Sequence, residues 1–131
     1  MPPDRRIALG RLGESAAARH LERAGLRTLE RNYRAREGEL DLIALAGRTL
    51  VFCEIKTLVA RGAPGPGPAS PLEAIRPAKR IQVRRVARSW LAERRAAGNL
   101  PRFGDIRFDA VGVLLSRRGE ILQLDHITGA F

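Results

Sequence analysis

Three acidic residues and a lysine gather at one end of two adjoining apolar runs in this sequence. The runs, residues 39–46 and 49–57, are rich in Leu, Ile, Val and Phe, and Gly47-Arg48 separates them. A glycine at the first position of a two-residue link is typical of a type II′ turn, so the runs are predicted to form a β-hairpin. The pairs predicted at its far end are Asp41 opposite Glu54 and Glu39 opposite Lys56.

The predicted pair of Asp41 and Glu54 brings two carboxylates together. Cβ atoms of opposed residues lie about 4.5–5.5 Å apart, and like charges so placed destabilise a sheet and raise one pKa unless a cation lies between them. A divalent metal ion would be such a cation. The alternative is a rim of ordinary ion pairs, with Glu39 bound to Lys56 and Asp41 to an arginine from elsewhere. The spacing alone leaves both interpretations open.

The apolar residues of the hairpin indicate that both of its faces are covered. Side chains alternate between faces along a strand, so each face can be assigned from the sequence. One face is predicted to carry Leu40, Leu42, Ala44, Val51, Cys53 and Ile55. The other carries Ile43, Leu45, Leu50 and Phe52 near the turn, followed by the four charged residues. A hairpin that is apolar on both sides belongs in the middle of a covered sheet.

The composition indicates one globular domain, residues 1–131, with a strong positive charge. Hydrophobic residues make up 44% of the chain, and 24 Lys and Arg against 14 Asp and Glu give a formal net charge of +10 and a pI near 11.5. A domain this basic favours a polyanionic partner, with nucleic acid ahead of a membrane surface. Because GC-rich coding also produces arginine-rich chains, the charge is supporting evidence only.

The cysteine content and the hydropathy pattern predict a cytoplasmic protein. The single cysteine, Cys53, excludes an internal disulfide and suits a reducing compartment. No apolar run approaches the roughly 20 residues of a membrane span, and the amino-terminal segment lacks the apolar core of a signal peptide.

The first amphipathic segment places one further acid where it can meet the hairpin. A helix is predicted over residues 7–24, after a polar lead-in, and Gly25 is its expected stop. Around Glu14 this helix carries only small residues, which would let it lie close to a sheet. They are Gly10, Ala17 and Ala18. The alternative is a solvent-exposed helix glutamate.

The middle of the chain predicts a strand over residues 26–33 before the hairpin and a loop after it. Residues 58–69 are rich in Pro and Gly and are predicted to form a flexible loop, either a lid over the acidic end or a passive surface loop. Ser70-Pro71-Leu72-Glu73 has the pattern of a capping box. A second helix is predicted from Pro77 to about Ala97.

The second predicted helix carries cations at helical spacing. Few acids interleave, so these like charges repel one another unless phosphates screen them. The alternative is a solvated basic face. The residues predicted to contact nucleic-acid phosphates are Arg76, Lys79, Arg80, Arg84 and Arg88.

The last part of the chain predicts two more strands, over residues 106–115 and 120–127. The element order therefore makes an α/β domain with a five-stranded mixed sheet flanked by helices. Arg107 and Asp109 share a face of the first of these strands, so Asp109 either joins the acidic group or, as the favoured alternative, pairs with an arginine. His126 lacks a second His or Cys at ligand spacing, which argues against zinc.

Several segments, taken in order, carry a family resemblance. They are Gly13-Glu14, Gly38–Ile43, Phe52–Lys56, Ser70-Pro71, Lys79, Arg107–Asp109 and the closing Ile127…Ala130-Phe131. Together they resemble the YraN family of bacterial proteins. That family looks like the restriction-endonuclease-like, PD-(D/E)XK fold, whose nucleases carry an Asp and then an (Asp/Glu)-x-Lys motif on the next strand. Asp41 and Glu54-Ile55-Lys56 match that pattern. Glu14 matches the first-helix glutamate of the subgroup similar to archaeal Holliday-junction resolvases.

The resemblance implies a metal-dependent endonuclease that acts on structured or branched DNA. It implies that Asp41, Glu54 and Lys56 are catalytic. It also implies that Glu14, Asp41, Glu54 and the backbone carbonyl of Ile55 bind Mg²⁺ or Mn²⁺, hard cations that prefer oxygen ligands. Lys56 would then orient the attacking water and offset negative charge in the transition state.

The chain also departs from the family pattern, and two other functions compete. Leu40 stands where many such nucleases have proline, and Leu58 stands where the family usually has an arginine. One competing function is a nuclease-like fold that binds nucleic acid without cutting it. The other is a homodimeric scaffold protein that pairs through the apolar strand Val111–Leu115.

Overall fold

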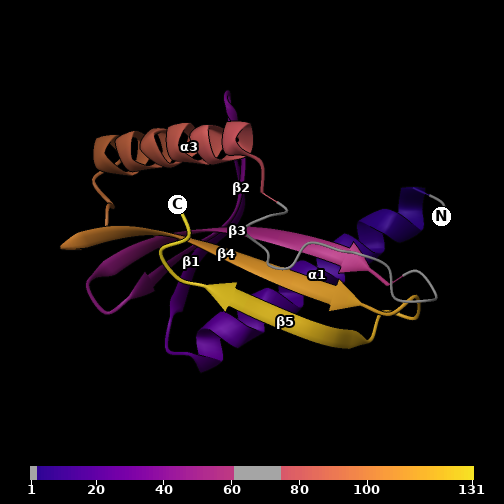
Figure 1. Cartoon of the computed structure of the whole chain (residues 1–131). Coiled ribbons are helices and arrows are strands. Elements are labelled where there is room, and N and C mark those ends of the chain that lie inside the picture. The colour runs from indigo at the N-terminus through magenta and orange to yellow at the C-terminus, as the bar shows by residue number, and fades with distance from the viewer. Residues whose placement is uncertain (1–2, 61–74) are drawn as a thin grey trace.

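The computed structural model describes residues 3–60 and 75–131, which form a five-stranded mixed sheet with a helix on each face (Figure 1). The elements are α1 (Pro3–Arg23), β1 (Arg27–Ala35), β2 (Gly38–Ala46), β3 (Thr49–Val59), α3 (Pro77–Ala96), β4 (Asp105–Leu115) and β5 (Ile121–Ile127). The strand order is β1-β2-β3-β4-β5, with β3 and β4 parallel and the other neighbours antiparallel. The predicted α/β fold class is confirmed, and the arrangement is consistent with a restriction-endonuclease-like fold.

The ends of the elements follow local sequence signals. Gly47 has a φ of +60°, as the first central residue of a type II′ turn requires, and Gly25 follows the end of α1 with a φ of +95°. The expected polar lead-in is wrong, because α1 begins at Pro3 rather than at residue 7. Proline is favoured in the first turn of a helix, and Asp4 in that turn complements the positive end of the helix dipole.

Each helix covers its own apolar layer of the sheet. In one layer, Leu9, Ala17 and Leu21 of α1 pack with Leu42, Val51 and Cys53; in the other, Val83, Val86 and Trp90 of α3 pack with Ile43, Leu50 and Phe52. The two faces predicted for the hairpin are therefore confirmed over this region. Leu40 is the exception, because it packs with Tyr33 in the α3 layer. The prediction is wrong there because β2 pairs only with β1 at that position.

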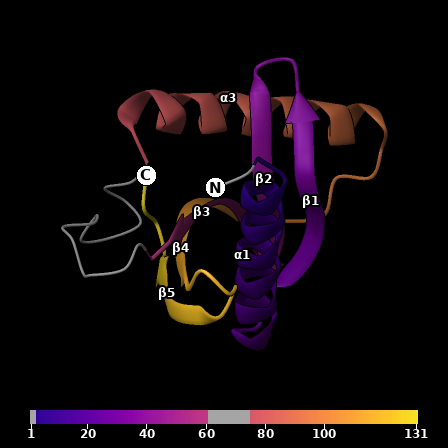
Figure 2. The same ribbon diagram turned by 90° about the vertical axis from the view of Figure 1, so that its right-hand side faces the viewer.

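The β2–β3 ladder is shorter than the sequence predicts. The register with Ala46 opposite Thr49 is confirmed, but pairing ends at Leu42 opposite Cys53. The expected backbone pairs Asp41–Glu54 and Glu39–Lys56 are therefore wrong. Towards its amino-terminal end β2 pairs with β1 alone, and Glu39 forms an ion pair with Arg34 at 3.6 Å. Figure 2 shows β1 and β2 continuing past α3 as a two-stranded arm.

Helix α1 approaches β3 most closely at Gly13. A Cβ atom at this position would lie 2.0 Å from Oγ1 and 2.9 Å from Cβ of Thr57, so no other residue fits without movement of the backbone. Gly10, which the sequence suggested as part of the close face, meets nothing within 4 Å. The contact that brings Glu14 down towards the sheet is therefore made by its immediate neighbour, Gly13.

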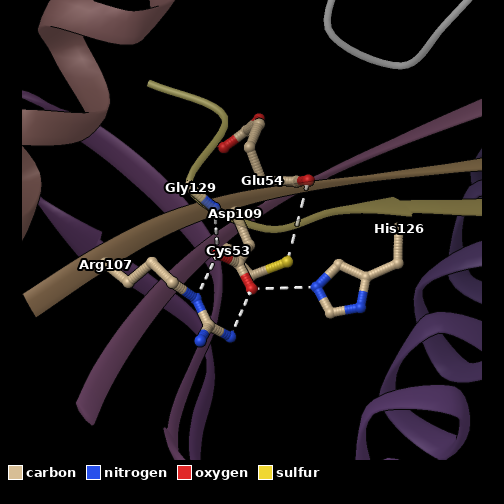
Figure 3. Close-up of polar contacts among 6 residues, drawn as sticks. All are labelled: Cys53, Glu54, Arg107, Asp109, His126 and Gly129. Atoms are coloured by element: carbon tan, nitrogen blue, oxygen red, sulfur yellow. Dashed lines mark hydrogen bonds and ion pairs between the residues drawn. The ribbon is translucent and has the colours of Figure 1, made fainter.

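Asp109 is a fully buried acid on β4 whose charge is neutralised by its neighbours (Figure 3). Its carboxylate accepts hydrogen bonds from Arg107 at 2.8 and 2.9 Å, from His126 Nε2 at 2.8 Å and from the Gly129 amide at 3.0 Å. Burial alone would raise the pKa of Asp109, but these hydrogen bonds outweigh it and hold the pKa at about 2. The predicted pairing with an arginine is confirmed, and Asp109 joins β4 to β5 and the segment after it.

Some predicted features fall outside the residues that the structure describes. They are the Pro/Gly loop from residue 61 onward and the Ser70–Glu73 capping box. The start predicted for that loop, residue 58, is wrong because β3 runs to Val59. Within residues 3–60 and 75–131, no helix is long and apolar enough to cross a membrane.

The strand that was predicted to support a homodimer is not accessible. β4 lies between β3 and β5, so both of its edges are already paired. Val111, Val113 and Leu115 are buried in the α1 layer. The prediction of a homodimer through Val111–Leu115 is therefore wrong.

We expect Gly13→Ala to lower the free energy of unfolding by about 1–3 kcal/mol, because the new methyl group collides with Thr57. Gly10→Ala is the matched control. Its methyl group meets no other atom, and removing a glycine from a helix stabilises by about 0.5–1 kcal/mol. Urea unfolding of both variants measures the difference. Equal effects of the two substitutions would contradict the close approach at Gly13.

We expect Asp109→Asn to be less stable than wild type at neutral pH and to lose that disadvantage in acid. The pKa of Asp109 lies below its usual 3.8, so its stabilising effect is complete above that pH and disappears as the pH falls towards 2. The stability gap should therefore shrink by about 2 kcal/mol between about pH 5 and pH 2. Urea unfolding across this range measures it, with the exposed Asp105→Asn as control. If the difference in stability between wild type and Asp109→Asn stays constant across this range, the charge of Asp109 does not stabilise the fold.

Candidate metal centre

Asp41 lies at the point where β2 separates from β3. Its Oδ2 accepts a hydrogen bond from the backbone N–H of Ile55 at 2.7 Å. In a continuous ladder, that amide would donate to a carbonyl of β2, but pairing has ended two residues earlier, at Leu42 opposite Cys53. The side chain of Asp41 therefore replaces a missing backbone acceptor, and this bond fixes its position.

Glu54 is buried on β3 next to Asp41 and has few partners of its own. Its Oε1 lies 3.5 Å from Nζ of Lys79, at the start of α3. Its Oε2 is buried, and no hydrogen-bond donor reaches it within the residues that the structure describes. A buried polar oxygen without a donor is costly, so this atom is a candidate ligand for a cation.

The carboxyl groups of Asp41 and Glu54 are close enough for each to affect the pKa of the other, although their backbones are not paired. Burial, followed by the charge of Asp41, raises the pKa of Glu54 to about 8, and Lys79 opposes this rise. Burial also raises the pKa of Asp41, against the hydrogen bond from Ile55. The predicted crowding of two acids is thus present, and without a bound cation Glu54 holds a proton near neutral pH.

Glu14 reaches this pair from α1, at the edge of the group. Burial raises its pKa, and the negative charges of Asp41 and Glu39 raise it further. Asn32 of β1 lies between Glu14 and Glu39. With its amide nitrogen turned towards them, it donates to Glu14 Oε2 at 3.3 Å and to Glu39 Oε1 at 3.1 Å.

The sequence reasoning missed Asn32. Its φ is +51°, and it is the one residue other than glycine with a positive φ in the described parts of the chain. Asparagine tolerates this conformation better than most residues, so an asparagine inside a strand pattern was the available signal. The unusual backbone places a neutral donor between two carboxylates.

A pocket of about 900 Å³ opens over the acidic pair between the sheet and the first half of α3. Asp41, Glu54, Ile55 and Lys56, the residues of the predicted site on β2 and β3, are among those that line it. Four cations line the pocket, namely Lys56, Arg76, Lys79 and Arg85. Lys56 is exposed there, so it can meet a ligand in the pocket. Leu58, in the position of the usual family arginine, is absent from the lining. Lys79 and Arg85 of α3 and Arg76, the residue before it, supply the charges other than Lys56.

Polar contacts to the β1–β2 arm fix α3 above the site. Gln82 donates to the backbone oxygen of Glu37 at 2.8 Å, Ser89 to the Glu37 side chain at 3.0 Å, and Trp90 to Glu30 at 3.0 Å. A Cβ atom on Gly38 would lie 2.4 Å from the Gln82 amide nitrogen. These contacts set the position from which Lys79 reaches Glu54.

The five residues predicted to bind phosphates do not form one ridge around the acidic pair. Arg76 and Lys79 line the pocket over Asp41 and Glu54, which we call the acid pocket. Arg80 donates to the carbonyl of Ile75 at 3.3 Å. Arg84 and Arg88 line a separate groove beside β4.

The residues present fit a divalent metal in their chemistry. Two carboxylates, one with an unpartnered buried oxygen, and a nearby backbone carbonyl are the hard oxygen donors that Mg²⁺ and Mn²⁺ prefer. Within residues 3–60 and 75–131, no three His, Cys, Asp or Glu side chains stand close enough together to enclose an ion. The structure thus brings Asp41 and Glu54 together and places Glu14 at their edge. The full ligand set of Glu14, Asp41, Glu54 and Ile55 stays a prediction.

Fold and site together define an α/β protein whose central strands hold a carboxylate pair beneath a basic pocket. The chain belongs to the family described as "Uncharacterised protein family UPF0102", whose model matches residues 13–113. This confirms the YraN family resemblance. The matched span contains Glu14, Asp41, Glu54 and Lys56.

Similar proteins of this family occur in several bacteria. The chain is 44% identical over 124 residues to a UPF0102 protein of Frankia casuarinae, covering 95% of this chain and 96% of the relative. It is 47% identical over 114 residues to one of Streptomyces griseus, covering 87% and 88%. It is 41% identical over 128 residues to one of Pelotomaculum thermopropionicum, covering 98% of each. The similarity therefore spans the complete fold.

We expect the stability of the metal-free protein to fall as the pH rises from about 4.5 to about 8, relative to a Glu54→Gln variant. The folded protein holds a proton on Glu54 that the unfolded chain releases near pH 4.5, so raising the pH favours unfolding across this window. The amide keeps the shape and carries no charge, so Glu54→Gln should match wild type near pH 4.5 and exceed it at pH 8. Urea unfolding in EDTA measures this. A wild-type advantage at pH 8 would contradict the raised pKa.

Proposed function

We propose that this protein is a divalent-metal-dependent endonuclease that hydrolyses phosphodiester bonds in structured or branched DNA. The observation that carries the proposal is the pair of half-buried Asp41 and buried Glu54, whose Oε2 has no partner among the described residues and which lines a pocket with four cations. The acids suit a metal ion, and the cations suit the phosphates of a nucleic acid. The formal charge of +10 supports a polyanionic substrate.

Each residue of the site has a definite role in this proposal. Asp41, Glu54 and the Ile55 carbonyl would hold Mg²⁺ or Mn²⁺, with Glu14 at the edge of the set. When bound, the ion would supply Lewis-acid polarisation of the scissile phosphate and a lower pKa for a coordinated water. Lys56, exposed in the pocket, would orient the attacking water and offset negative charge in the transition state.

The cations of α3 would bind the substrate on either side of the reacting phosphate. Arg76 and Arg85 are exposed and line the pocket. Lys79 is engaged with Glu54 at 3.5 Å, so a phosphate and Glu54 would compete for its ammonium group. DNA structure rather than sequence is the proposed determinant, because the pocket presents charge and no array of donors and acceptors that could distinguish base edges.

A non-catalytic nucleic-acid-binding module is the second candidate, and the Lys79–Glu54 contact favours it. In such a protein, the lysine would permanently neutralise the buried acid, and no metal would be needed. Binding would then persist after Asp41→Asn and in EDTA, with a strong dependence on salt. This candidate and the nuclease share the basic pocket and differ in what the acids do.

The proposal predicts that Asp41→Asn loses nuclease activity while remaining folded. Asparagine keeps an oxygen that can accept the Ile55 hydrogen bond but removes a metal-binding charge. We expect wild type to nick branched, flapped or single-stranded DNA in Mn²⁺. The variant should nick the same DNA at a rate at least about 100-fold lower. The exposed Asp105→Asn makes the same chemical change away from the site and should retain full activity. Equal nicking by wild type and Asp41→Asn would refute the site.

A further inference from the structure

A second cavity lies beside β4, on the other flank of α3 from the acid pocket. It has a volume of about 550 Å³, within the range of roughly 300–1,000 Å³ that is usual for ligand sites. We call it the β4 groove and define it by Arg84, Arg88, Arg107, Phe108, Leu91 and Phe131. Within the residues that the structure describes, its lining contains three arginines and no acidic residue. The groove therefore combines aromatic surface with positive charge.

The aromatic residues of the groove form a continuous stack that supports one arginine. Phe108 is stacked on Phe52 with ring centres 5.5 Å apart, and Phe131 tilts against Phe108 at 5.7 Å. The guanidinium carbon of Arg84 lies 4.7 Å from the centre of the Phe108 ring. An aromatic ring restrains the orientation of the guanidinium plane that lies on it. A ligand that stacks on this guanidinium therefore loses less conformational entropy on binding than one that must order a mobile arginine.

Arg88 and Arg107 supply charge around this planar group. Arg88 is exposed one helical turn beyond Arg84, at the right spacing to contact a neighbouring phosphate. Arg107 is anchored from below by its two hydrogen bonds to buried Asp109, which hold its side chain at the rim (Figure 3). The groove thus offers flat surfaces and fixed positive charges within a few residues of one another.

We propose that the β4 groove binds an unpaired nucleotide of a single-stranded nucleic acid, with its base stacked on Arg84 and Phe131 and its phosphates bound by Arg88 and Arg107. Flat π-surfaces and guanidinium planes bind bases whose faces are free, whereas the bases of a duplex are stacked inside the helix. The guanidinium groups of Arg84 and Arg88, together with the Arg107 nitrogen that does not bind Asp109, complement a phosphodiester backbone. The ligand class that matches both features is a single strand.

This inference rests on the proposed function, which supplies its ligand class, nucleic acid. It adds that the substrate carries an unpaired strand. Arg84 and Arg85 are consecutive in α3, yet Arg85 lines the acid pocket and Arg84 the β4 groove. Successive residues of a helix point about 100° apart, so the two sites lie on adjacent flanks of one helix. A nucleic acid that is cut in the acid pocket would therefore extend an unpaired end across α3 into the groove, as a flap or a branch does.

The test measures binding without cleavage. The Asp41→Asn protein in EDTA is titrated against a fluorescent oligothymidylate of about 12 nucleotides, a length within the usual range of single-strand sites. Added Arg88→Gln removes a proposed phosphate contact, so it should weaken binding several-fold and make the slope of log K against log salt shallower by about 0.7. Arg95→Gln, an exposed arginine of α3 outside the groove, is the matched control and should change the slope little.

The stacking part of the inference has its own variants. Arg84→Lys keeps the charge and removes the planar group, and Phe131→Leu keeps an apolar side chain and removes the ring. Each should weaken binding about fivefold to tenfold at an unchanged salt slope. An oligonucleotide with 2-aminopurine should lose fluorescence on binding to the parent protein and keep more of it with either variant. Thermal unfolding of all variants confirms that the fold is retained.

The outcomes separate this inference from the proposed nuclease activity. Groove variants that bind as tightly as their parent, or that weaken no more than Arg95→Gln, overturn the inference even if wild type cuts DNA. Wild type that binds single strands through the groove but never cuts in Mn²⁺ supports the inference and refutes the nuclease. Equal competition by duplex and single-stranded DNA at the groove overturns the assignment to unpaired nucleotides.

Discussion

The hydrogen bond from the Ile55 amide to Asp41 is the interaction on which the site depends. β2 leaves β3 after Leu42, and a buried amide in the middle of β3 would otherwise lack an acceptor, at a cost of about 1–3 kcal/mol. The side chain of Asp41 replaces the missing carbonyl. One carboxylate is thereby fixed beside Glu54, and the separation of the strands leaves room above the pair for the acid pocket. The same break in the ladder thus satisfies the backbone and concentrates the negative charge.

The two helices hold the site from opposite faces of the sheet, and each does so through one close contact. Gly13 lets α1 lie against Thr57, which carries Glu14 towards the pair. Gly38 leaves space for Gln82, whose hydrogen bond to the arm fixes the start of α3 and so places Lys79. Both glycines lie within motifs that the sequence analysis quoted, but their packing partners are far away in the chain. The site therefore combines a sheet with two helices. The lack of a Cβ atom at Gly13 and at Gly38 sets how closely each helix approaches the strands.

The hairpin, its turn and the order of elements along the chain could be predicted because each rests on a local signal. Gly47 specifies the turn, and alternation of apolar residues specifies the faces of the strands. The end of the ladder at Leu42 could not be predicted, since it depends on how β2 twists away with β1 under α3. For the same reason, Asn32 was missed and Leu40 was assigned to the wrong layer. The carboxylate pair was nevertheless correctly foreseen, because side chains as long as Glu54 can meet across a strand separation that ends backbone pairing.

Two buried acids on neighbouring strands show how the surroundings decide what a carboxylate can do. Asp109 accepts four hydrogen bonds, two of them from Arg107, and its pKa lies at about 2, so it has neither a free oxygen nor a reason to bind a cation. Glu54 has one ion pair and an unpartnered oxygen, and its pKa lies at about 8. Lys79 stabilises its charged form only in part, and a further cation at the site would stabilise it more. Within one sheet, the first acid is used to hold strands together, and the second is kept unsatisfied beside a pocket, as a functional group requires.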